Sequence, residues 1–173
     1  MHIKRLFGIA LLTTLAAGCT DRALGEFSSL EYRGDYEEGE EDKPKKCTYT
    51  IGYWKTHNVY AKQPKKQIPW PLPEDTMACG QSLYDWLHTP PKGDPDVILG
   101  HQTIGALLNL YQGAQFGDVE YAALQDALAL LDPCDIADED AAYAIELSEI
   151  LDSFNNGELE SPHCDDLADD EDD

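Results

Sequence analysis

Three of the five histidines in this chain are the first candidates for chemistry. His57, His101 and His163 lie far apart in the sequence. Three imidazoles and a water molecule form a common zinc site, and imidazole also suits copper. The sequence therefore permits a zinc- or copper-binding module, or a metalloenzyme, built on these three residues. The alternative is that each ring is a structural hydrogen-bonding group, which suits His101 because it lies on the apolar face of an expected helix.

A cluster of acids is a second candidate for metal binding. The cluster consists of Asp132, Asp135, Asp138, Glu139 and Asp140. An EF-hand loop needs a central glycine and a glutamate six residues after it, and no glycine occurs within this cluster. The acids fit either an irregular calcium site or the positive N-terminal end of a following helix. Apart from Zn, Cu or Ca, we expect no cofactor.

Aromatic and cationic residues at positions 53–55 are candidates for ligand binding. Tyr53 and Trp54 offer ring faces of the kind that stack on sugars, and Lys55 adds a positive charge. The alternative is that the rings pack in a core and the lysine lies on the surface. The chain has no G-x-S-x-G, Walker or H-E-x-x-H motif. We therefore assign no catalytic residue, and a hydrolase with an unidentified acid pair is only a third hypothesis.

The N-terminus predicts a lipoprotein signal peptide over residues 1–18. Lys4 and Arg5 precede an apolar run over residues 6–15, which is shorter than the roughly 20 residues that span a bilayer. The run leads into Leu-Ala-Ala-Gly before Cys19, which resembles a lipobox, the lipidation and cleavage site of bacterial lipoproteins. We therefore predict lipid on Cys19, and two or more acyl chains there would hold the protein stably on a membrane.

The residue after Cys19 bears on the destination of the protein. Thr20 stands there, and not the aspartate that signals retention in the inner membrane of enteric bacteria. We therefore expect a cell-envelope location, lipid-anchored and in the outer membrane. The alternative is an ordinary secretory signal peptide followed by a chance cysteine.

The other four cysteines favour two disulfides. They are Cys47, Cys79, Cys134 and Cys164, and an even number in an exported chain is typical of disulfide pairing. Three pairings are possible. We favour Cys47–Cys164, which would tie the two borders of the folded region together, with Cys79–Cys134 inside it. A thiolate metal site is the alternative, but the chain lacks a Cys-x-x-Cys pair.

Charge limits the expected partners. The formal net charge is −22, which argues against binding nucleic acid or anionic lipid headgroups, since both need a basic surface. Residues 19–46 and 165–173 are acidic and lack hydrophobic periodicity, so we predict a disordered tether and a disordered tail. The folded domain is expected over residues 47–164.

Apolar periodicity predicts four helices that would position the candidate residues. Their expected ranges are 81–88, 95–112, 118–131 and 138–154, and the proline-rich residues 59–79 are expected to form a loop. Asp94 and Pro95 suit the start of the second helix, and Gly113 suits its end. The expected inward residues include His101, Tyr111, Tyr121, Ala141, Ile145 and Ile150. The predicted fold is mainly α, a small helical bundle with an irregular aromatic N-terminal part.

Several ordered motifs resemble a secreted bacterial domain family. They are CTYTIGYWKTH at 47–57, LHTPPKGDPDVILGHQTIGALLNLYQGA at 87–114, LDSFNNG at 151–157 and HC at 163–164. Pro162 replaces the glycine that usually precedes the last motif. The resemblance implies an extracellular module bracketed by Cys47 and Cys164, and it implies no catalytic activity.

Together these patterns predict a cell-envelope lipoprotein that displays a small disulfide-stabilised helical module. The module would have a binding or structural role, with an envelope glycan or a protein as the expected partner. The membrane would be contacted through the lipid on Cys19. The metal-binding module is the alternative.

Overall fold

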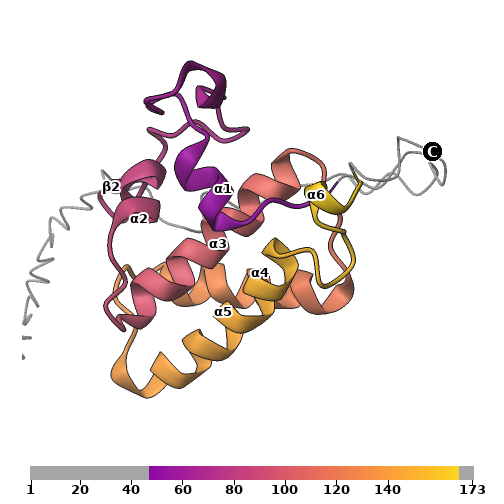
Figure 1. Cartoon of the computed structure of the whole chain (residues 1–173). Helices are drawn as coiled ribbons and strands as arrows, with labels where there is room; N and C mark the ends of the chain where they lie inside the picture. Colours follow the sequence, from indigo (N-terminus) through magenta and orange to yellow (C-terminus); the bar gives the residue numbers. More distant parts are fainter. Residues whose placement is uncertain (1–46, 168–173) are drawn as a thin grey trace, which may run out of the picture.

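The computed structural model describes residues 47–167. The predicted signal peptide, lipidation site and tether lie outside the described residues, as do positions 168–173 of the predicted tail. The described part is mainly helical (Figure 1), with two disulfides and an irregular aromatic N-terminal part, as the sequence predicts. Within it, no helix combines the length and the apolar composition that crossing a bilayer requires.

The elements follow one another in a simple order. They are α1 (Ile51–Thr56), η2 (Pro64–Lys66), β1 (Met77–Ala78), β2 (Gln81–Ser82), α2 (Leu83–His88), α3 (Pro95–Tyr111), α4 (Asp118–Leu131), η3 (Asp138–Asp140), α5 (Ala141–Asn155) and α6 (Cys164–Leu167). β1 and β2 form a short antiparallel hairpin in which Met77 lies opposite Ser82. α6 extends the helical part three residues beyond the predicted border at Cys164.

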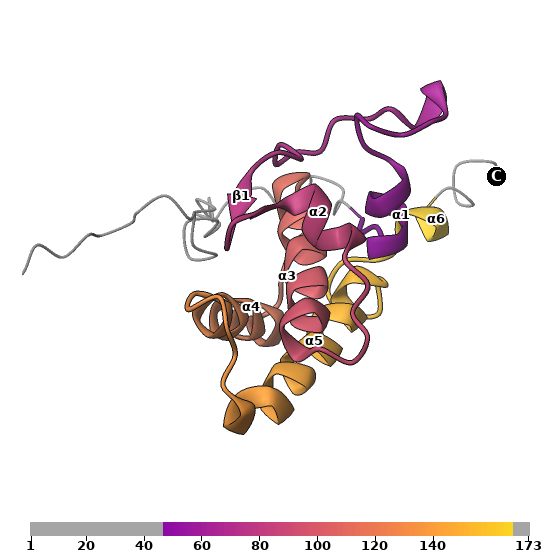
Figure 2. The ribbon, with the colours of Figure 1, turned by 90° about the vertical axis from the view of Figure 1, so that its left-hand side faces the viewer.

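Helix α3 is the centre of the fold. It contacts α1, α2, α4 and α5, and both views show it surrounded by them (Figures 1 and 2). Apart from half-buried Gln102, every residue from Leu99 to Leu110 is buried, as expected for a helix that is apolar on most sides. Tyr111 is exposed, contrary to prediction, because it forms the last turn beyond the covered part.

The ends of α3 follow the predicted chemistry. The side chain of Asp94 accepts a hydrogen bond from the backbone N–H of Asp96 at 3.1 Å, and Pro95 is the first helical residue. Gly113 follows the helix with a φ of 104°, a conformation that favours glycine. These signals were sufficient to predict the start of the helix and to place its end within one residue.

Helices α4 and α5 pack against each other and against α3. The range of α4 is as predicted, but Tyr121 is exposed because the buried stripe of α4 runs through other residues, which are Glu120, Ala123, Leu124, Ala127, Leu128 and Leu131. Helix α5 begins at Ala141, three residues later than predicted, because residues 138–140 form a 3-10 turn. Its buried stripe is Ala144, Leu147, Ser148, Leu151, Phe154 and Asn155. Ala141, Ile145 and Ile150 flank this stripe and are only half-buried.

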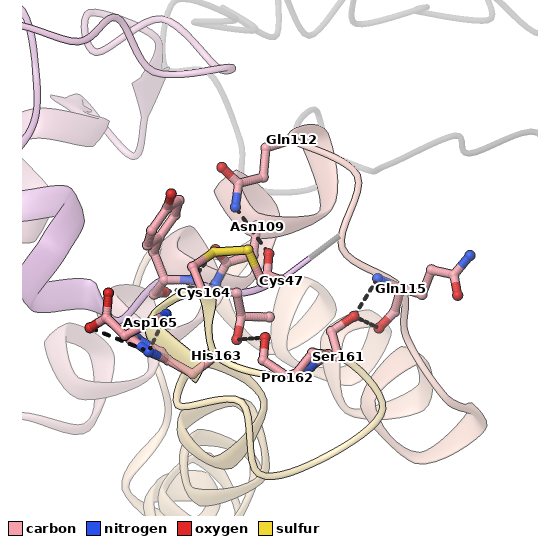
Figure 3. The surroundings of a disulfide bond; sticks show 11 residues. Cys47, Asn109, Gln112, Gln115, Ser161, Pro162, His163, Cys164 and Asp165 are labelled. Carbon is pink, nitrogen blue, oxygen red and sulfur yellow. Dashed lines mark hydrogen bonds and ion pairs between the residues drawn. A yellow bond between two sulfur atoms is a disulfide. The ribbon is translucent and has the colours of Figure 1, made fainter. Parts of the chain in front are cut away.

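Two disulfides join distant parts of the chain, and both pairings confirm the prediction. Cys47–Cys164 has a Cα–Cα distance of 4.7 Å, so the two ends of the domain leave it at one place (Figure 3). Beside it, the backbone N–H of Thr48 donates to Pro162 O at 2.8 Å, and the Cys164 N–H donates to Thr48 O at 3.0 Å. Pro162 is therefore compatible with a closed final turn. Cys79–Cys134 joins the hairpin to the segment after α4.

Candidate functional site

The predicted binding residues at positions 53–55 take different roles on α1. Trp54 is buried in the core, which agrees with the alternative of core packing, and its part in ligand binding stays a prediction. Tyr53 is half-buried between two rings, with centroids 3.8 Å from Tyr49 and 4.1 Å from His57. Burial and the neighbouring Tyr49 raise the pKa of Tyr53 to about 12. Lys55 lines a pocket, whereas Tyr53 and Trp54 do not line it. A helix of 3.6 residues per turn necessarily points three consecutive side chains in different directions.

Lys55 is held by a buried histidine. His101 is 3% exposed, and its Nε2 lies 2.7 Å from Trp86 O. A carbonyl oxygen only accepts hydrogen bonds, so Nε2 carries a proton. Nδ1 then accepts from the Nζ of Lys55, 3.5 Å away. Burial and the positive charge of Lys55 lower the pKa of His101, and burial lowers the pKa of Lys55. A neutral imidazole therefore positions a lysine ammonium.

The three candidate metal-binding histidines have separate surroundings. His57 Nδ1 lies 3.1 Å from Tyr53 O, and His163 Nδ1 lies 3.6 Å from a carboxylate oxygen of Asp165. Both ring nitrogens of His101 have protein partners. No three His, Cys, Asp or Glu side chains within residues 47–167 are grouped so that they could hold a metal ion. The metal hypothesis thus gains no support from the geometry and stays a prediction for elemental analysis.

Lys55 faces a pocket of about 290 Å³ between α1, the segment after it and α2. We call this the Lys55 pocket, and its walls include Lys55, Asn58, Tyr60, Lys62, Lys66 and Tyr84. Three of these side chains are cationic, and no carboxylate of residues 47–167 lines the pocket. Oriented ammonium and amide donors next to aromatic rings can bind a negatively charged group on a ring-shaped ligand.

Asn58 fixes the floor of the Lys55 pocket. It is buried, its Nδ2 donates to Lys55 O at 3.0 Å, and its Oδ1 accepts from the Tyr60 N–H at 3.0 Å. Its backbone N–H donates to Lys66 O at 3.1 Å. One asparagine thus connects backbone groups of three pocket residues, so the cationic side chains project from a defined backbone.

Glu74 closes the base of the segment that carries the pocket. Its carboxylate is buried, and its Oε1 accepts from the Val59 N–H at 3.0 Å and from the Trp70 N–H at 3.2 Å. Nearby, Trp70 Nε1 donates to His57 O at 2.8 Å. These bonds join the two ends of residues 57–74. We call these residues the projecting segment, and both ribbon views show it after α1 (Figures 1 and 2).

Aromatic rings line one side of the pocket. The Tyr60 and Tyr84 rings meet edge to face at 4.8 Å, and Tyr84 stacks on His88 at 4.0 Å. Tyr60 is 56% exposed, so it presents ring surface to solvent. Two other tryptophans, Trp70 and Trp86, are buried in the core.

The charges of the chain are divided between two regions, a feature that sequence reasoning missed. Residues 47–92 contain five lysines and three acids, whereas residues 93–173 contain twenty-two acids and no lysine or arginine. The positions of these lysines along the chain are visible in the sequence. What it did not reveal is that Lys55, Lys62 and Lys66 converge, because that depends on the bonds of Asn58 and Glu74.

Four residues of the motifs at 47–57, 87–114 and 151–157 are joined by hydrogen bonds. Asn109 Oδ1 accepts from the Tyr49 N–H at 2.9 Å, and its Nδ2 donates to Tyr49 O and to Asn155 Oδ1. Asn155 Nδ2 donates to Gln102 O at 3.0 Å. These motif positions therefore hold the first segment, α3 and α5 together.

Comparison with family models, curated proteins and solved structures returned no match.

Proposed function

We propose that this chain is a lipid-anchored envelope protein whose folded module binds an acidic glycan in the Lys55 pocket. The observation that carries the proposal is the convergence of Lys55, Lys62 and Lys66 on a pocket without carboxylates, in a chain with a net charge of −22. Like charges that line one pocket repel one another, and an anion placed among them offsets that repulsion. A carboxylated ligand supplies that anion.

The walls of the pocket support a sugar rather than a small inorganic anion. Tyr60 and Tyr84 offer ring faces and edges, which suit the apolar face of a pyranose. Thr56 and Gln63 add polar groups along the same walls, whereas the amide of Asn58 is used for hydrogen bonds within the protein. A volume of about 290 Å³ is close to the lower end of small-ligand sites, which fits one sugar residue of a longer chain.

The proposed attachment places the module at the end of a tether. Lipid on Cys19 would leave twenty-seven residues between the membrane and Cys47. As a flexible coil, such a segment averages about 30 Å end to end. The projecting segment that carries the pocket would then reach polymers near the membrane surface.

Calorimetric titration tests the binding proposal. The mature chain with Cys19→Ser, which carries no lipid, is titrated with a hexuronate trisaccharide and with its uncharged methyl ester. We expect binding of the acid only, and a loss of at least about tenfold in affinity for Lys62→Met/Lys66→Met, because charge-assisted hydrogen bonds disappear.

Lys92→Met is the matched control, because Lys92 does not line the pocket. Absence of any binding, or equal binding of the acid and the ester, would contradict the proposal. So would an equal loss of affinity in the Lys92 variant, which would indicate a general charge effect.

Metabolic labelling tests the attachment. Cells that express the full chain are given radiolabelled palmitate, and we expect label in the native protein and none in Cys19→Ser. Label that persists in this variant, or a mature N-terminus other than residue 19, would contradict lipidation at Cys19.

A further inference from the structure

The outer face of the α4–α5 pair carries a groove that the proposed function does not use. Its volume is about 380 Å³, and we call it the α4–α5 groove. Its floor contains the apolar side chains of Val119, Ala122, Ala123, Leu147 and Ile150. Its rim contains the carboxylates of Asp118, Asp126 and Glu146. The residues of this groove belong to helices that take no part in the Lys55 pocket.

Two large apolar side chains of this groove are exposed. Val119 is 63% exposed and Tyr143 is 43% exposed. Tyr143 extends from α5 toward α4, where its hydroxyl donates to Asp126 Oδ2 at 2.6 Å. Exposed apolar surface bordered by polar groups is typical of protein interaction sites.

The charge around the groove selects the partner. No lysine or arginine occurs between Gly93 and the C-terminus, so the rim carboxylates have no cationic side chain of α4 or α5 beside them. A negative rim around an apolar floor complements a segment with an apolar stripe and basic flanks. The overall negative charge attracts such a segment and repels a second copy of the chain.

We propose that the α4–α5 groove binds a basic amphipathic helix of a partner protein. Asp118 and Asp126 are eight residues apart, or about 12 Å along α4. Lysine or arginine residues seven or eight positions apart on the partner helix match this separation. The small side chains of Ala122 and Ala123 between them leave room for the apolar stripe of the partner. This is the helix-in-groove mode of peptide recognition.

Fluorescence anisotropy with a defined probe tests this proposal. The probe is a labelled 18-residue helix of Leu and Lys with Leu at three- and four-residue spacing, added to the mature Cys19→Ser chain. We expect the Asp126→Asn/Glu146→Gln variant to bind about fivefold more weakly, because two rim charges are lost. Val119→Ser should also weaken binding, because apolar contact area is lost.

Matched controls separate the groove from general attraction to an acidic protein. Asp138→Asn/Glu139→Gln removes the same charge from the exposed η3 turn, and Leu159→Ser removes another exposed apolar side chain outside the groove. Both should bind like the parent chain, and a scrambled probe without an apolar stripe should bind weakly. Equal effects of groove and control variants would overturn the proposal, as would equal binding of the scrambled probe. Self-association that only the groove variants abolish would also overturn it, because the occupant would then be a second copy.

Discussion

His101 and Lys55 form the pair that links the core to the proposed binding site. The buried imidazole uses Nε2 for Trp86 O and Nδ1 for Lys55 Nζ. A protonated His101 would place a second positive charge next to the ammonium and remove the acceptor on Nδ1. The position of His101 thus agrees with the alternative that its ring is a structural hydrogen-bonding group. The ring affects the pocket through its contact with Lys55.

This pair predicts a specific dependence of stability on pH. The pKa of His101 is lowered from 6.5 by burial and by Lys55, so below that value the unfolded chain binds a proton that the folded chain resists. Folding stability therefore falls as pH drops below about 6.5, by at most about 1.4 kcal/mol per pH unit. Urea unfolding at pH 7 and pH 5 should show a smaller loss for His101→Gln than for the native residue. An equal loss in both proteins would contradict the lowered pKa.

At the scale of elements, the projecting segment depends on Glu74. Glu74→Ala leaves the Val59 and Trp70 N–H groups without their acceptor. An unsatisfied buried donor costs about 1–3 kcal/mol, so we expect a loss of about 2–4 kcal/mol and faster hydrogen exchange at these two amides. Asp75→Ala is the control, because Asp75 is exposed. Unchanged exchange in Glu74→Ala would show that the segment is held by other contacts.

The turn after α5 depends on Gly157. Its φ is 74°, and a Cβ there would meet the backbone nitrogen of His163, whereas Gly93 has a φ of 87° with no atom within 4 Å of its Cβ position. Gly93→Ala should therefore cost about 1 kcal/mol for conformation alone, and Gly157→Ala at least about 3 kcal/mol, because overpacking adds to it. Thermal unfolding of the two variants measures this difference. Similar costs would mean that the final turn adjusts freely.

The helices were more predictable than the segment that carries the pocket. For α3 and α4, local signals were sufficient, since caps, glycine and apolar spacing all lie within the element. Helix α1 lies in the N-terminal part that the sequence predicts to be irregular. It is a six-residue helix capped by Thr50. The segment of residues 57–74 takes its shape from bonds between distant residues, such as Glu74 to Val59. Such pairs leave no periodic pattern in the sequence.

At the scale of the whole molecule, the two disulfides close loops of different length. Their sequence separations are 117 for Cys47–Cys164 and 55 for Cys79–Cys134. Chain-entropy estimates give about 5 and about 4 kcal/mol. Replacing each pair by serine should therefore lower the free energy of unfolding by several kcal/mol, slightly more for the first pair. Chemical unfolding tests this order, and a larger loss for the second pair would show that native contacts outweigh loop entropy.

The division of charge is the other feature of the whole molecule. Within the described residues, all five lysines lie in residues 47–92, and three of them line the Lys55 pocket, whereas the α4–α5 groove lies in the region without cationic side chains other than histidine. Composition predicted a net acidic protein that avoids nucleic acid. It could not predict two pockets lined by opposite charges, because their positions follow from the bonds of Asn58 and Glu74 and from the packing of α4 against α5.

Mapping of amide chemical shifts tests the central claim most directly. The isotope-labelled mature chain with Cys19→Ser is saturated with the hexuronate trisaccharide. We expect shifts concentrated at residues 55–66 and at Tyr84, with α4 and α5 unchanged. Shifts centred on any other surface, or no shifts at saturating ligand, would contradict the proposal that the Lys55 pocket binds an acidic glycan.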